Sequence, residues 1–196
     1  MKKPFQRLRD LIHSRTRGRT VLILLVPTLA VYVLMLIWSI PTLVEYSGGM
    51  KIFDMQPLGY DYQYARSLLE SLGTEGRQFY LSSQIPLDLI YPGLFALTYA
   101  LLLGWLLRRD APLHGRLAWL VLTPVFAGLF DYFENAAIFL MLTSYPDLSG
   151  GLVSVSNVFT LLKSGLTTLT LVMVIIGFAW MLRARRRRTP APADPD

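Results

Sequence analysis

The sequence has no cysteine and only two histidines among its 196 residues. The missing thiols exclude disulfides, iron–sulfur clusters and cysteine-ligated zinc. His13 and His114 each lie close to an arginine in a short polar segment, so we expect neither a metal site nor a cofactor. The P-loop, dinucleotide-binding, zinc-protease and serine-hydrolase motifs are also missing. The sequence therefore does not indicate the common chemistries of soluble enzymes.

Charged residues are scarce as well. Asp, Glu, Lys and Arg make up only 16% of the chain, whereas 53% is hydrophobic and mean hydropathy is +0.43. This composition is typical of a polytopic membrane protein. A bilayer core about 30 Å thick needs about 20 apolar residues in a helix. Four segments qualify, at about residues 21–40, 85–107, 117–142 and 152–182. We predict an all-α, four-transmembrane-helix bundle with one membrane domain at 21–182.

The segments outside these spans divide into two tails and three loops. Pro41 predicts the end of the first span, because proline cannot donate a helical hydrogen bond. Within the long loop 41–84, residues 60–72 favour an amphipathic helix, since Tyr64, Leu68 and Leu72 share one face. Gly73 is a suitable stop for that helix. We expect this extracytoplasmic segment to lie on the outer membrane surface.

The charges of the tails and loops predict the orientation. The tails 1–20 and 183–196 and the short loop 108–116 are basic, whereas loop 41–84 has more acidic than basic residues. The positive-inside rule therefore places both termini in the cytoplasm, with the chain integral to the plasma (inner) membrane. The same rule explains the basic tails without nucleic acid, so the expected partner is the lipid bilayer.

Polar side chains interrupt the third and fourth apolar segments. Asp131, Glu134 and Asn135 are spaced i, i+3, i+4, so they share one side of a helix. Lys163 lies in the fourth segment. At a rise of 1.5 Å per residue, Asp131 and Lys163 both lie about 16 Å inward from the outer end. The lysine and the two carboxylates are therefore predicted to meet at one depth.

Further polar residues are expected around this group. Asn157 and Thr160 continue a polar stripe on the fourth segment, and Asp88 lies near the outer end of the second. The predicted rim of the pocket consists of Arg77, Tyr80 and Tyr91. A charge at mid-bilayer costs about 2.5–3.5 kcal/mol on insertion scales. These groups must therefore face inward, pair with one another or hold protons.

Three functions fit this pattern. The leading hypothesis is an acidic pocket in the outer half of the bundle that binds a small polar or cationic molecule or a lipid headgroup. Asp131 and Glu134 would supply its negative charge, and Asn135 and Asn157 would orient the ligand. One alternative is a structural or assembly subunit with a membrane-protein partner, in which the buried charges latch the helices. The other is a membrane enzyme that uses Asp131 or Glu134 as a general acid on a lipid-borne substrate, although no nucleophile is evident.

Overall fold

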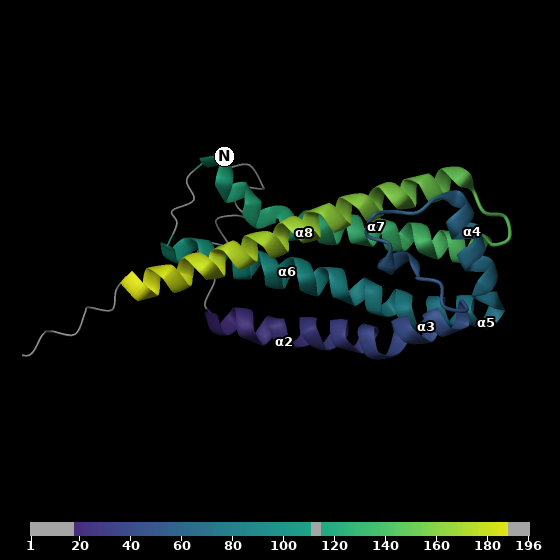
Figure 1. Ribbon diagram of the computed structural model, residues 1–196, viewed down its shortest axis with the longest axis horizontal. Coiled ribbons are helices and arrows are strands. Elements are labelled where there is room, and N and C mark those ends of the chain that lie inside the picture. Colours follow the sequence, from purple (N-terminus) through teal and green to yellow (C-terminus); the bar gives the residue numbers. More distant parts are fainter. Residues whose placement is uncertain (1–17, 111–114, 188–196) are drawn as a thin grey trace, which may run out of the picture.

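The computed structural model describes residues 18–110 and 115–187, and this part of the chain is helical and contains no strand (Figure 1). Four helical stretches are long and apolar enough to cross a membrane, as the sequence predicts. They are Gly18–Tyr46, Gly73–Leu106, Trp119–Ser144 and Gly150–Arg183. Each overlaps one of the predicted apolar segments and extends beyond it at one end or both.

The four long helices run side by side along the length of the molecule (Figure 1). They are α2 (Gly18–Leu34), α6 (Ile85–Asp110), α7 (Thr123–Ser144) and α8 (Gly150–Arg187). Helix α6 is central, because it packs against α2 on one side and against α7 and α8 on the other. A 3₁₀ segment, η4 (Gly115–Leu122), leads into α7, whose first turn contains Pro124. Proline is well placed there, since the first N–H groups of a helix have no helical partner.

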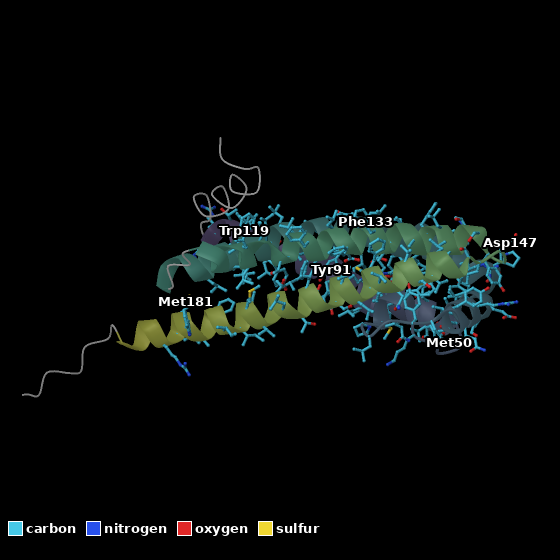
Figure 2. The ribbon with its side chains drawn as sticks, turned by 90° about the horizontal axis from the view of Figure 1, so that it is seen from above. Met50, Tyr91, Trp119, Phe133, Asp147 and Met181 are labelled. Atoms are coloured by element: carbon cyan, nitrogen blue, oxygen red, sulfur yellow. The ribbon has the colours of Figure 1, made fainter. Side chains whose placement is uncertain are left out.

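The short elements gather at one end of the bundle, which we call the loop end. They are η2 (Phe53–Met55), α4 (Tyr62–Ser71) and α5 (Gly73–Phe79) (Figure 1). Figure 2 shows Met50 and Asp147 at this end, and Trp119 and Met181 toward the opposite end. We call the opposite end the termini end, because α2 begins there and α8 finishes there.

The amphipathic helix expected at 60–72 is present as α4. The Asp61 carboxylate accepts a hydrogen bond from the Tyr64 backbone N–H at 2.7 Å and so caps the helix. Gly73 follows with a φ of +61°, a left-handed conformation that favours glycine at a helix end. The buried face of α4, which includes Leu68 and Leu69, joins the largest apolar cluster of the described residues. The side of the membrane on which α4 lies stays a prediction.

The prediction that the first helix ends at Pro41 is wrong. The chain passes from α2 through a π-helical turn, η1 (Met35–Ser39), into α3 (Ile40–Tyr46). A proline inside a helix removes one hydrogen bond and crowds the carbonyl four residues earlier. The wider π turn just before Pro41 relieves this crowding, so the helix continues.

The same arrangement occurs before the second long helix. A π-helical turn, η3 (Tyr80–Gln84), joins α5 to α6 and immediately precedes Ile85 and Pro86. Helix therefore extends through residues 41–46 and 73–84, which the sequence assigned to the long loop. In both places the π turn is followed by the dipeptide Ile-Pro.

The long helices are held together by small and hydroxyl residues as well as by apolar packing. Thr28 and Thr98 join α2 to α6 through their hydroxyls at 2.8 Å. At Gly128, an added Cβ would lie 2.7 Å from the Pro92 carbonyl oxygen and 3.1 Å from the Ala96 Cβ. Helices α6 and α7 therefore approach so closely that only glycine fits at this contact.

Gly128→Ala is expected to destabilise the protein, because the new methyl group would overlap backbone that cannot move freely. Overpacking of this kind typically costs about 1–3 kcal/mol. The matched control is Gly165→Ala, since an added Cβ at Gly165 meets nothing within 4 Å. Thermal unfolding in mild detergent should show a lower melting temperature for Gly128→Ala but not for Gly165→Ala. Equal melting temperatures would contradict the close contact.

Candidate functional site

The side chain of Lys163 lies at the centre of a charge cluster in the loop half of the bundle. Its Nζ is 2.5 Å from Glu134 Oε2, 3.0 Å from Asp131 Oδ1 and 3.5 Å from Asp54 Oδ1. Helix α8 positions the lysine, and α7 positions Asp131 and Glu134 one turn apart. The structure thus brings together the three residues that the depth calculation places at one level. Asp54 comes from η2 and was not predicted.

Glu134 is the most deeply buried of these carboxylates, with no exposed surface. The Thr160 hydroxyl donates a hydrogen bond to Glu134 Oε1 at 2.5 Å, so Lys163 and Thr160 each contact one carboxylate oxygen. Thr160 itself is 1% exposed. The predicted stripe on α8 therefore supplies both a charged and a neutral donor to Glu134.

Asn135 connects α7 to α6. Its Nδ2 donates to the backbone carbonyl of Asp88 at 3.0 Å and to Asp131 Oδ1 at 3.2 Å. The Asp88 carbonyl is free to accept because Pro92, four residues later, has no N–H. The proline in α6 thus creates a buried acceptor, and Asn135 satisfies it.

The Asp88 side chain lies in the same buried region and is 4% exposed. Gln84, one turn earlier, donates from Nε2 to Asp88 Oδ1 at 3.0 Å. Three buried oxygens of this group have no hydrogen-bond partner: Gln84 Oε1, Asp88 Oδ2 and Asn135 Oδ1. Unpartnered buried acceptors are rare in proteins and call for an explanation, such as a bound molecule or a proton.

Tyr80 lies inside the bundle, although the sequence predicts it at the rim. It has no exposed surface, and its hydroxyl donates to Asp54 Oδ2 at 2.8 Å. The neighbouring loop residues Ile52 and Phe53 are also fully buried. The loop therefore inserts into the bundle and delivers Asp54 to Lys163, instead of covering the site from outside.

Tyr60 lies between the cluster and the surface. Its hydroxyl is 2.7 Å from Ser156 Oγ, one turn of α8 before Thr160, and its backbone N–H donates to Asn157 Oδ1 at 2.9 Å. Gly59, with a φ of +89°, lies so close to Asn157 that an added Cβ would overlap the amide oxygen.

Outside Tyr60 there is an open hollow of about 790 Å³ between α4 and α8. Its lining includes Tyr60, Asp61, Gln63, Ser67 and Asn157. Asn157 therefore belongs to this outer hollow and does not contact the charged groups of the cluster.

The two other predicted rim residues lie away from the cluster. Arg77 donates from Nη1 to the Leu69 carbonyl at 2.7 Å, and its guanidinium lies 4.4 Å from the centre of the Tyr145 ring. It holds α4, α5 and the α7–α8 turn together. Tyr91 stacks on Tyr32 of α2 with ring centres 5.6 Å apart. Neither residue contacts Lys163 or its carboxylates.

The cluster contains more acidic groups than basic ones. Four carboxyl groups belong to it: Asp54, Asp88, Asp131 and Glu134. Among side chains 18–106 and 119–183, which the structure describes, Lys163 is the only cation within ion-pair distance of them. Over the same residues, no three His, Asp or Glu side chains are arranged to hold a metal ion.

Comparisons of the chain with protein-family models, with curated proteins and with solved structures find no significant match. The function must therefore be inferred from the geometry of the site itself.

Lys163→Met is expected to destabilise the protein strongly. It leaves Glu134 buried and Asp131 partly buried without a counter-charge, and breaking a buried ion pair in this way costs about 3–5 kcal/mol. Adding Glu134→Gln to Lys163→Met should restore part of the loss, because one uncompensated carboxylate is removed. The matched control is Lys51→Met, since Lys51 is exposed. Thermal unfolding of the wild type and the three variants measures this difference, and wild-type stability in Lys163→Met would show that the ion pairs contribute nothing.

Tyr60 should make the protein sensitive to alkali. Burial raises the pKa of Tyr60 from its ordinary value of 10.0 to about 12. The folded state then retains the phenolic proton that the unfolded state loses near pH 10, so this contribution to stability is complete below pH 10 and is lost as the pH rises toward 12. Tyr60→Phe should flatten the fall in melting temperature over that range. The control is Tyr62→Phe, because Tyr62 is 40% exposed. The melting temperature of this variant should fall with pH as that of the wild type does.

Proposed function

We propose that the protein is an integral membrane protein, with both termini in the cytoplasm, that binds a small molecule carrying an ammonium group at its acidic cluster. The free amine and the headgroup of a lipid are two sources of this same chemistry. The four apolar helices support the membrane assignment. The distribution of loop charges supports this orientation, in which the loop end lies outside.

The observation that carries the proposal is the surplus of acidic groups. The ammonium of Lys163 is shared by Asp54, Asp131 and Glu134, and its single charge can compensate only one of them. Asp88 adds a fourth carboxyl group that is 4% exposed. Several uncompensated carboxylates in a buried site are unfavourable, so the cluster favours the uptake of further positive charge.

The unpartnered oxygens favour a donor-rich cation. Gln84 Oε1, Asp88 Oδ2 and Asn135 Oδ1 are acceptors without a donor, and the three residues are linked through Asp88. An ammonium group offers up to three N–H donors and one positive charge. It therefore suits both the missing donors and the missing charge.

The outer hollow supplies a route to the cluster. It lies at the loop end, and its lining combines polar side chains, Asp61 among them, with the apolar Met50 and Leu58; Tyr60 forms part of its wall. The hydroxyl of Tyr60 contacts Ser156, which lies one turn from the Thr160 that binds Glu134. Movement of the Gly59–Tyr60 segment would connect the hollow with the cluster.

One observation favours the latch alternative. Glu134 has a partner at each carboxylate oxygen, and its contacts join α7 to α8. A structural role for this pair alone does not require a ligand, so the experiment must separate ligand binding from stability.

Native mass spectrometry of protein released from mild detergent tests the proposal. Wild type should retain a discrete non-protein mass, and Glu134→Gln and Asp131→Asn should lose that mass while remaining folded. The matched control is Glu75→Gln, since Glu75 is exposed and lies outside the cluster. A small amine or an aminophospholipid would identify the source of the ammonium group. No retained mass on wild type, together with much earlier melting of both variants, would favour the latch.

A further inference from the structure

A second feature lies in the other half of the bundle, remote from the charge cluster. Near the termini end, a groove of about 600 Å³ lies between α2 and α8, and its floor is α6, which packs against both. Its walls include Leu25 and Leu29 on α2, Leu102 and Trp105 on α6, and Val174 and Phe178 on α8. The lining is almost entirely apolar.

The position of the groove decides what can fill it. It lies within three of the four stretches that can span a membrane. Its α2 wall runs from Gly18 to Leu29, which is about 16 Å at 1.5 Å per residue. An apolar groove at membrane depth does not hold water, because water finds no hydrogen-bond partners there. The occupant must therefore be hydrocarbon.

The charges beside the groove indicate which class of lipid supplies this hydrocarbon. Arg19 is exposed and follows Gly18 at the open end, on the same side of α2 as Leu22, which also lines the groove. On α8, the exposed Arg183 lies about 7 Å beyond Phe178 toward the termini end. The sequence adds a run of four arginines at 185–188. An acyl chain in the groove would therefore bring its headgroup toward Arg19 and Arg183, and arginines attract anionic lipid.

We propose that the groove between α2 and α8 is a binding site for one anionic phospholipid of the cytoplasmic leaflet, with an acyl chain against α6 and the phosphate beside Arg19 and Arg183. The lipid fills the space between two helices that make few contacts with each other and so completes the termini half of the bundle. This inference rests on the membrane orientation proposed above but not on a ligand at the charge cluster.

Two pairs of neighbouring residues allow a sharp test. Ile175 lines the groove and is 67% exposed, whereas Ile176, 51% exposed, does not line it. On α2, Leu22 lines the groove and is 64% exposed, whereas Val26, 70% exposed, does not. Tryptophan at either lining position would occupy the space of the acyl chain. All four side chains are exposed already, so the substitutions should leave the fold intact.

The experiment is native mass spectrometry of protein exchanged into detergent containing equal amounts of dioleoyl phosphatidylglycerol and dioleoyl phosphatidylcholine. Wild type should retain one phosphatidylglycerol in preference to phosphatidylcholine. Ile175→Trp and Leu22→Trp should lose it at least ten-fold, whereas Ile176→Trp and Val26→Trp should retain it. Arg19→Gln should weaken the preference for phosphatidylglycerol by about five-fold, as expected for one arginine near a phosphate. Arg66→Gln, which changes an arginine at the loop end, should leave the preference for phosphatidylglycerol unchanged.

The site is refuted if the lining and control tryptophans have equal effects, because the lipid would then be bound at no particular place. Equal retention of the two lipids by wild type would refute the role of the arginines. Glu134→Gln should keep the phosphatidylglycerol whatever its effect on the charge cluster. Its behaviour therefore separates a failure of this site from a failure of the ammonium site.

Discussion

The ammonium of Lys163 holds the loop half of the bundle together. It contacts carboxylates from α7 and from the loop element η2, while α8 carries the lysine itself. Helix α6 joins the same group through Asn135, which bridges Asp131 and the Asp88 carbonyl. Moving an ion out of water costs several kcal/mol even after relaxation. Such a cluster is tolerable only if each charge keeps close partners, so the helices and the loop can deviate little from their positions.

This requirement connects the charges to the unusual backbone around them. Because Pro92 has no N–H, the Asp88 carbonyl is free to accept a hydrogen bond from Asn135. The Pro92 carbonyl also packs closely against Gly128 of α7. The π turn η3 ends at Gln84, which lies one helical turn before Asp88 and donates a hydrogen bond to it. A second π turn, ending at Ser39, lies next to the first. Proline and glycine therefore determine where the polar groups of α6 lie, and the acidic cluster depends on irregular helices as much as on charge.

The sequence predicts the parts of this arrangement that follow from local periodicity. Long apolar runs predict the four helices, and the i, i+3, i+4 spacing with the rise per residue predicts that Asp131 and Glu134 lie at the level of Lys163. Asp54 could not be predicted in this way. It lies in a loop that has no regular pattern, and the lysine that it contacts is 109 positions later in the sequence. Gln84 carries a signal in the sequence, because it is a polar residue four positions before Asp88 and therefore lies on the same side of a helix. Pro41 misled the prediction because its effect on a helix depends on the turn before it.

The space between the helices is filled differently in the two halves of the bundle. In the loop half, the space between helices is filled by paired polar groups and by a loop that brings Asp54, Phe53 and Tyr80 together. In the termini half, α2 has only Val21 and Thr28 buried among its 17 residues, so the part of the chain that the structure describes leaves most of that helix uncovered. Helix α8 belongs to both halves: Lys163 faces the charges, and Phe178, about four turns later, faces the groove. The groove and the charge cluster thus share this helix but no side chain.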